Sequence, residues 1–122
     1  MKTKKIVIKS REDLQAEELA FARKLDRGEK VRTLKGEYFE SLEAVRRYLT
    51  DARLDLWRTI RDKKPESITE LTKLLGRNFA DVHQDLHILV DVGLVDLRKP
   101  KGAKTRALKP VSLVDQLRFE VA

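Results

Sequence analysis

The sequence of 122 residues contains no cysteine and only three prolines. The missing cysteine excludes disulfide bonds, cysteine-ligated metal sites and thiol catalysis, and it fits a reducing compartment. Apolar runs are short as well. Only Ile6 to Ile8 stand between the basic first residues and Lys9, which is too few for a secretory signal. No stretch approaches the roughly 20 apolar residues that cross a bilayer, so we expect a cytoplasmic protein.

Sequence motifs for catalysis are missing too. The five glycines do not form a glycine-rich phosphate loop or a Gly-x-Ser-x-Gly nucleophile elbow. The acidic residues stand among lysines and arginines, in segments that we expect to be surface helices. We therefore expect neither an enzyme nor a bound cofactor.

Charge, in contrast, is abundant. Charged residues make up 39% of the chain and hydrophobic residues 41%, which is enough for a core. The formal net charge is +7 and the sequence pI is about 9.8. A basic balance of this size favours an anionic partner, above all nucleic acid. The length predicts a single domain.

The clearest pattern lies in residues 67–109. A serine cap and apolar residues at helical spacing predict a short helix that ends at Gly76. A second amphipathic helix is predicted over residues 79–92, with Phe79 and Val82 among the residues that face the core. Two short helices joined by a glycine turn must pack together, because neither buries its apolar face alone.

A hairpin is predicted after these helices. Residues 94–97 and 105–108 are expected to form its strands, and the segment 98–109 holds six basic residues and no acidic one. The order helix, turn, helix, strand, basic loop, strand is that of a winged helix-turn-helix. We therefore predict an α+β fold with this motif as its core.

The remaining segments extend this core. Residues 1–40 are predicted to form a strand over residues 4–9, a helix up to Asp26 and a short hairpin around Gly36. Residues 41–122 then make up the winged helix-turn-helix domain. Alternating apolar residues near position 119 predict a C-terminal strand, which we expect to pair with the N-terminal one.

Two helices are predicted to precede the helix-turn-helix, capped by Ser41 and Thr50. Leu42 is expected to face inward from the first helix and Ala52 from the second. Leu54 lies roughly opposite the inward line of the second helix. It therefore needs a further partner, either the N-terminal segment or another subunit.

The polar side of helix 79–92 is the main candidate for DNA contact, because a recognition helix presents its first turns to the major groove. Asparagine and glutamine pair with adenine and arginine with guanine, so Gln84 and Asn78 are expected to read bases and Arg77 to read a base or hold a phosphate. His87 and Ile88 are expected to face outward. The full predicted set of DNA-binding residues is Arg77, Asn78, Ala80, Asp81, Gln84, His87, Lys99, Lys101, Lys104 and Arg106.

The basic loop is expected to contact the DNA backbone or minor groove as a wing, with salt-dependent affinity. Two plainer readings compete with DNA binding: an ordinary solvated helix face and a basic hairpin without a partner. Asp81 and Asp85 weigh against phosphate contact. Asp81 also suits the helix N-terminus, and Asp85 can pair with a neighbouring lysine.

His83 and His87 raise a second possibility, because they have the spacing of the histidines in zinc proteases. Those enzymes have a glutamate after the first histidine, and here Gln84 stands there, which cannot take a proton from zinc-bound water. No third ligand is identifiable in the sequence. We expect His83 to pack at the helix flank, with zinc binding as the alternative.

The chain resembles a family of small prokaryotic winged-helix proteins described as predicted transcriptional regulators or DNA-binding proteins. Their helix-turn-helix core is shared with MarR-like and ArsR-like regulators. The resemblance runs from Phe39 to Leu97, and Gln84 departs from it, since that position is commonly arginine in the family. The segments that carry the resemblance are Phe39-Glu40-Ser41-Leu42-Glu43, Tyr48-Leu49-Thr50, Ser67-Ile68-Thr69-Glu70-Leu71, Val82-His83-Gln84-Asp85-Leu86 and Gly93-Leu94-Val95.

The resemblance and the residues together predict a sequence-specific regulator of transcription. We expect it to bind double-stranded DNA as a homodimer and to repress nearby genes by occupying their promoter. The resemblance also implies an alternative, in which the protein is an antitoxin that binds a toxin and regulates its own operon.

Overall fold

The computed structural model describes residues 1–28, 38–99 and 107–122, and this part of the chain forms five helices and five strands. The fold mixes helices with two small sheets, in agreement with the predicted α+β class. The helices are α1 (Arg11–Asp26), α2 (Leu42–Tyr48), α3 (Asp51–Lys63), α4 (Ile68–Leu75) and α5 (Phe79–Val92). The strands are β1 (Thr3–Ile8), β2 (Tyr38–Phe39), β3 (Val95–Arg98), β4 (Lys109–Ser112) and β5 (Gln116–Val121).

Each helix begins at a polar cap residue. The side chain of the cap accepts a hydrogen bond from the backbone N–H three residues later, which satisfies one of the free donors of the first turn. The caps are Ser10, Ser41, Thr50, Ser67 and Asn78. Gly76 and Gly93 end α4 and α5 in the left-handed conformation, with φ of 65° and 86°. The predicted boundaries of these two helices are therefore confirmed.

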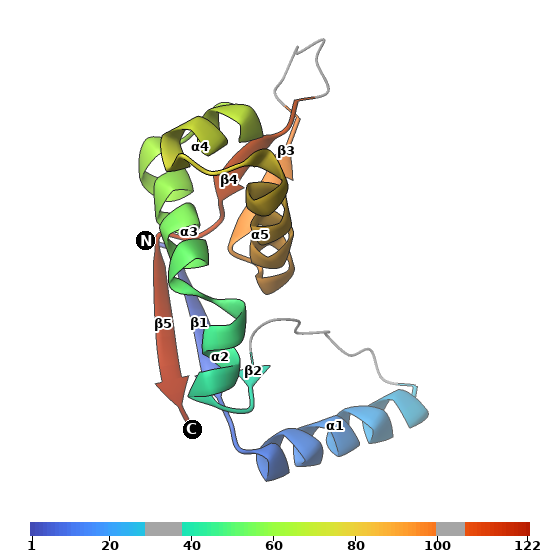
Figure 1. Ribbon diagram of the computed structural model, residues 1–122. Helices are drawn as coiled ribbons and strands as arrows, with labels where there is room; N and C mark the ends of the chain where they lie inside the picture. The colour runs from blue at the N-terminus through green and yellow to red at the C-terminus, as the bar shows by residue number, and fades with distance from the viewer. Residues whose placement is uncertain (29–37, 100–106) are drawn as a thin grey trace.

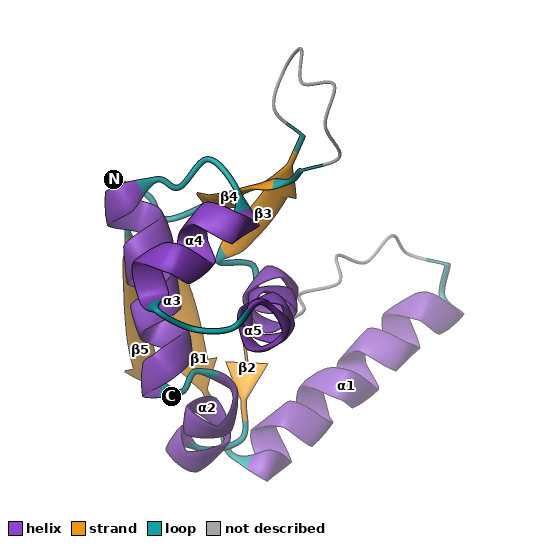
Figure 2. Ribbon diagram, turned by 45° about the horizontal axis from the view of Figure 1, so that its top comes forward, coloured by secondary structure: helices purple, strands orange, loops and turns teal. Residues whose placement is uncertain are grey.

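The three helices α3, α4 and α5 pack around one core, as Figures 1 and 2 show. Leu56, Leu71 and Leu86 are fully buried, one from each helix. The hydrophobic cluster continues into β1 through Ile6 and Ile8. Residues of the segments 1–40 and 41–122 thus share one core.

The larger sheet joins segments that are far apart in the sequence. Its order is β2-β1-β5 and all three strands are parallel. Thr3 pairs with Gln116 and Ile8 with Val121, which confirms the expected pairing of the two ends. Of the hairpin expected around Gly36, only β2 is described, and it pairs with β1; residues 29–37 lie outside the described residues.

The smaller sheet is an antiparallel pair of β3 and β4, in which Leu97 pairs with Pro110. The first strand is one residue from its predicted place, but the prediction of a returning strand over 105–108 was wrong: Ala107 and Leu108 are not in a strand, and β4 starts at Lys109. Proline has no backbone N–H to donate and is disfavoured within a sheet. In the described part of the chain β4 pairs only with β3, and an edge strand tolerates proline where the missing N–H faces away from its neighbour.

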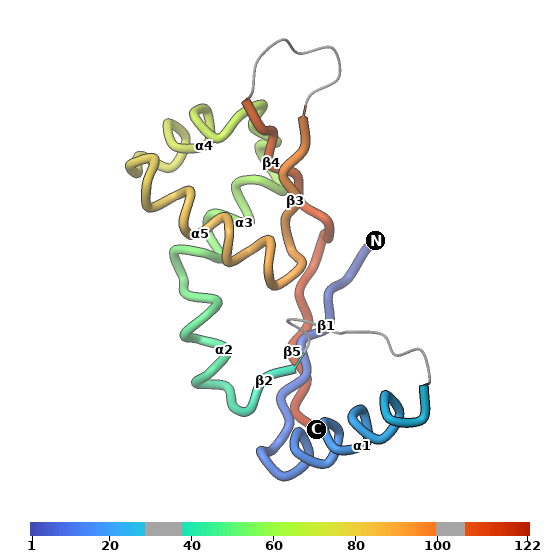
Figure 3. Tube along the Cα trace, turned by 90° about the vertical axis from the view of Figure 1, so that its right-hand side faces the viewer, coloured from blue at the N-terminus to red at the C-terminus, as the bar shows by residue number. Residues whose placement is uncertain are grey.

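Helix α1 extends away from the rest of the molecule in Figures 1 and 3. It begins at the predicted cap and ends near Asp26, as expected, but none of its residues is buried. Leu19 and Leu25 are 54% and 53% exposed, and Phe21 is half-buried. Most of its apolar side chains are therefore exposed to solvent, whereas the apolar side of a helix in a folded domain is normally buried.

Several side chains lie elsewhere than expected. Leu42 and Ala52 are exposed rather than inward, and Phe79 is 52% exposed. Leu54 and Ile88 are half-buried and pack against the core. Leu54 thus has a partner within the chain. No helix in the described ranges is long and apolar enough to cross a membrane.

Candidate nucleic-acid interface

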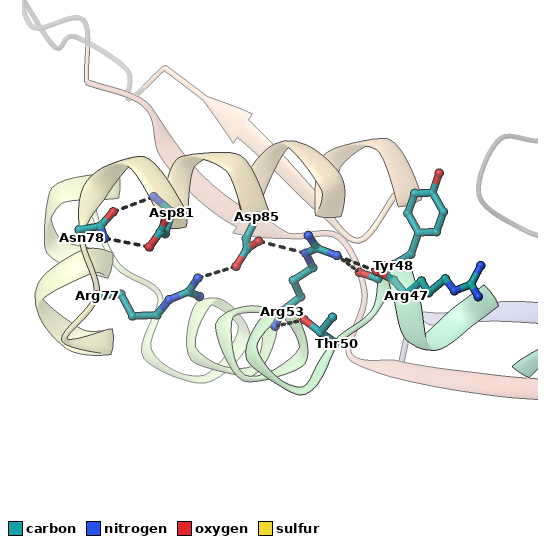
Figure 4. Close-up of polar contacts among 8 residues, drawn as sticks. All are labelled: Arg47, Tyr48, Thr50, Arg53, Arg77, Asn78, Asp81 and Asp85. Carbon is teal, nitrogen blue, oxygen red and sulfur yellow. Dashed lines mark hydrogen bonds and ion pairs between the residues drawn. The ribbon is translucent and has the colours of Figure 1, made fainter. Parts of the chain in front are cut away.

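A charged network fixes the turn between α4 and α5 and orients α5 (Figure 4). Asp85, on the inner side of α5, is only 8% exposed. Its carboxylate accepts a hydrogen bond of 2.6 Å from Arg77 and another of 3.0 Å from Arg53 of α3. The expectation that Asp85 pairs with a neighbouring lysine was wrong, since both partners are arginines. A carboxylate this deeply buried is stable only when it is paired and hydrogen-bonded.

Arg53 extends this network to α2. Its guanidinium also donates to the backbone carbonyls of Arg47 and Tyr48, at 3.0 and 2.9 Å. These carbonyls belong to the end of a helix, where they have no partner within the helix. One arginine therefore links the end of α2, the start of α3 and the middle of α5.

The side chain of Arg77 is therefore held by a contact within the protein. One of its terminal nitrogens donates to Asp85, and the other is buried without a hydrogen-bond partner. A guanidinium in this position shapes the α4–α5 turn.

The residues of α5 that were predicted to contact DNA lie at the surface, as does its cap Asn78. Ala80, Gln84 and His87 are exposed along α5. Asn78 is exposed too, but its side chain accepts from the backbone N–H of Asp81 at 2.9 Å and donates to the Asp81 carboxylate at 2.8 Å. Asn78 and Asp81 thus stabilise the start of the helix. The Gln84 amide makes no hydrogen bond within the described residues, so it can bind another molecule.

An aromatic row runs beside these residues, and sequence reasoning missed it. Phe79 stacks on His83 at 5.6 Å between ring centres, and His83 meets His87 edge-on at 4.5 Å. The expectation that Phe79 belongs to the core was wrong, and His83 is exposed rather than packed. The spacing of four residues was the available signal, since it places the three rings on one side of a helix.

A groove connects the start of α5 with the hairpin. It is lined by the beginning of α4, by the aromatic row and by the residues that lead into β4. The lining residues are Ser67, Ile68, Thr69, Phe79, His83, Ala107 and Leu108. The first turns of α5 and the residues that lead into β4 thus border one common surface, and the described parts of the two chain ends do not line it.

The electrostatics of this surface are mixed. Helix α5 contains no lysine or arginine, and Asp81 and Asp91 are exposed on it. Positive charge comes from the neighbouring elements, with Lys73 exposed on α4 and Lys99 exposed after β3. Arg98 pairs with Asp96 at 3.1 Å. The predicted wing residues Lys101, Lys104 and Arg106 lie outside the described residues.

In the described residues, no third ligand accompanies His83 and His87 for a zinc site. Across residues 1–28, 38–99 and 107–122, no three histidine, aspartate or glutamate side chains gather as metal ligands would. His83 and His87 instead meet through their rings.

The residues of this surface lie in a region of the chain that matches a known protein family. Residues 48–118 match the family HVO_A0114 over more than half of the chain. The chain belongs to the HVO_A0114 family. The region that matches HVO_A0114 includes α3, α4, α5, β3 and β4, and with them Arg53, Arg77 and Asp85. Helix α1 and strand β1 lie outside it. No curated protein matches the sequence.

Proposed function

We propose that the protein is a sequence-specific double-stranded DNA-binding regulator of transcription, with α3 to β4 as a winged helix-turn-helix. The observation that supports this most is the groove that joins the first turns of α5 to the residues entering β4. A recognition helix and a wing must face the same side to contact one duplex. Binding at a promoter would then repress transcription by excluding the polymerase.

In this proposal Gln84 is the principal base-reading residue. It is exposed one turn inside α5, and its amide matches the donor and acceptor of adenine in the major groove. Phe79 and Ala80 offer apolar contact for a thymine methyl group. Arg77 acts as a positioning residue for the turn, because Asp85 already holds its guanidinium.

The DNA backbone would be held by residues beside α5 rather than on it. Lys73 and Lys99 are exposed on the neighbouring elements, and the sequence places Lys101, Lys104 and Arg106 in the loop of the proposed wing. Phosphate contacts position the protein without selecting a sequence. We expect them to dominate the salt dependence of binding.

A homodimer is part of the proposal, and α1 is its best-supported interface. Leu14, Phe21 and Leu25 share one side of a helix that buries none of its residues. The first half of α1 is acidic, through residues that include Glu12 and Glu17, and its last turn carries basic residues, among them Lys24. Two copies packed antiparallel would cover the apolar side and set opposite charges against each other.

The uncovered helix also favours a second candidate, an antitoxin. A toxin seated on α1 would bury the same apolar residues, and DNA binding would then regulate the operon of the pair. Purification of the chain together with the product of a neighbouring gene would support this candidate.

Selection of bound sequences from random duplexes at two salt concentrations tests the main proposal. We expect an enriched motif at both concentrations and a steep fall in affinity at the higher one. With about six phosphate contacts, affinity should fall on the order of 10³-fold between 50 and 200 mM salt. Binding without an enriched motif would reject a sequence-specific regulator, and no binding at the lower concentration would reject DNA as the partner.

A further inference from the structure

A second cavity lies between the end of α3 and the β3–β4 pair. Its volume is about 660 Å³, within the range of small-molecule sites. The lining shares no residue with the groove. It consists of Ile60, Arg61, Lys64, Glu66, Arg98, Lys99, Lys109, Pro110, Val111, Ser112 and Asp115.

Positive charge dominates this lining. Five basic residues line it together with two acidic ones, and three of the five are paired: Arg61 with Asp62, Arg98 with Asp96 and Lys109 with Glu66. Within the described ranges, no acidic side chain pairs with the ammonium groups of Lys64 and Lys99. Lys109 reaches Glu66 only at 3.5 Å. Like charges repel when they share a cavity, so an anion that enters would relieve that repulsion.

Lys64 occupies an unusual backbone conformation for a lysine. It ends α3 with φ of 48° and ψ of 59°, and it is the one described non-glycine residue with positive φ. Glycine does the same at the ends of α4 and α5. A left-handed lysine is strained, and strain of this kind often marks a functional position. The strained residue contributes one of the two unpaired cations of the cavity.

The floor of the cavity is apolar, whereas its rim is basic. Ile60 and Pro110 are buried, and Val111 is half-buried beside them. An apolar floor beneath several cations suits an organic molecule that carries phosphate groups. We propose that this cavity binds a phosphate-bearing ligand, with Lys64 and Lys99 as the groups that hold its oxygens.

Trp57 provides a built-in reporter for this site. It is the one tryptophan of the chain. The Arg61 guanidinium lies over its ring at 4.7 Å, and its indole N–H donates to Ser112 at 2.9 Å. Both neighbours line the cavity. An anion that binds beside Arg61 and Ser112 should therefore change the fluorescence of Trp57.

The experiment is a fluorescence titration of the full chain with pyrophosphate, at constant ionic strength set by chloride. We expect a saturable change in Trp57 emission. Lys64→Gln should weaken the apparent affinity about tenfold, the effect of losing one charge-assisted hydrogen bond. Lys63→Gln removes the same charge from the neighbouring residue, which does not line the cavity, and should change affinity less than twofold.

Two outcomes would overturn the proposal: no saturable response in the unmodified chain, or equal weakening by the two substitutions. Circular dichroism of each variant separates lost binding from lost structure. Lys99→Gln, on the opposite wall, gives an independent second test and should also weaken binding.

A second arm identifies the source of the phosphate. The titration is repeated with the protein saturated by duplex DNA. If the response disappears, the cavity holds backbone phosphate of the duplex. If it persists, the ligand is a free phosphorylated molecule. The pyrophosphate titration does not depend on DNA binding, so failure of the regulator proposal and failure of this one are distinguishable.

Discussion

Arg77, the first residue after the glycine that ends α4, donates a 2.6 Å hydrogen bond to Asp85, eight residues further along the chain. This pair holds the turn between α4 and α5 against the inner side of α5. With Arg53 as the second donor to Asp85, it also fixes α5 against α3. The orientation of the proposed recognition helix thus depends on one nearly buried carboxylate.

Replacement of that carboxylate should destabilise the fold. In Asp85→Asn, both arginines lose their counter-charge while they stay largely buried. We expect a loss of about 2 to 3 kcal/mol in the free energy of unfolding, below the roughly 3–5 kcal/mol of a fully buried pair. Urea unfolding measures it. Asp91→Asn removes an exposed acid from the same helix and should stay within about 0.5 kcal/mol; equal effects of the two substitutions would contradict a structural role for the network.

Gln84→Ala tests base reading. In the proposed complex the amide would make one of the contacts that distinguish adenine from the other bases, so its removal should lower discrimination at one base pair by about 1–3 kcal/mol. Affinity for random duplexes should be almost unchanged. Binding measurements on the selected site and its single-base variants give both values. Gln15→Ala, in α1, is the matched control. Unaltered discrimination in Gln84→Ala would show that Gln84 does not read a base.

Phe21→Asp tests the dimer. A carboxylate in the centre of the apolar side of α1 should prevent pairing, because an unpaired charge would be buried at the interface. Light scattering after size-exclusion chromatography should give the dimer mass for the unmodified chain and the monomer mass for the variant. Leu19→Asp lies on roughly the opposite side of α1 and should remain dimeric. A monomeric unmodified chain at tens of micromolar would defeat the dimer.

Lys64→Gly tests the strain at the end of α3. Glycine adopts the left-handed conformation without a steric cost, whereas other residues lose roughly 1–2 kcal/mol. Part of this gain is offset by the greater freedom of glycine in the unfolded chain. We expect a net stabilisation of about 0.5–1 kcal/mol, seen as a higher Tm. A lower Tm would show that the lysine side chain stabilises the fold through contacts of its own.

The pH response of Asp62 gives a further test near the second cavity. The hydrogen bond from Arg61 is the main cause that lowers the pKa of Asp62 below its usual range. A lowered carboxyl pKa means that the pair stabilises the fold above the ordinary pKa of aspartate and that this contribution is lost as the pH falls. An NMR titration of the Asp62 carboxyl should show the low value, and Arg61→Gln should return it towards the usual range. No change in Arg61→Gln would assign the shift to another group.

The order of the elements could be predicted from local signals, and the caps show why. A serine, threonine or asparagine cap and a terminal glycine act on the residues next to them. The helix starts at Ser67 and Asn78 and the ends at Gly76 and Gly93 were therefore readable from the sequence. The pairing of the end strands was also predictable, because β-branched residues marked a strand over residues 4–9 and alternation marked one near position 119.

The predictions that failed depended on contacts made across the fold. Phe79 has the spacing of a core residue, but the α4–α5 turn leaves the first turn of α5 at the surface. Asp85 was read as a surface acid because its partner Arg53 stands 32 residues away in the sequence. No local pattern reports such a distance. The cavity beside Lys64 was missed for the same reason, since its walls come from α3, β3 and β4.

The parallel pairing of β1 with β5 has a consequence for the order of folding. The partners are joined across 113 residues, as between Lys2 and Asp115, and closing so long a loop is slow and entropically costly. During synthesis the helical core can assemble before the ribosome has made β5, so that β1 is still unpaired with that strand. Ile6 and Ile8, fully covered at the end, stay open to other chains until then. Nascent chains are thus most vulnerable to aggregation at β1, which is made well before its partner strand β5.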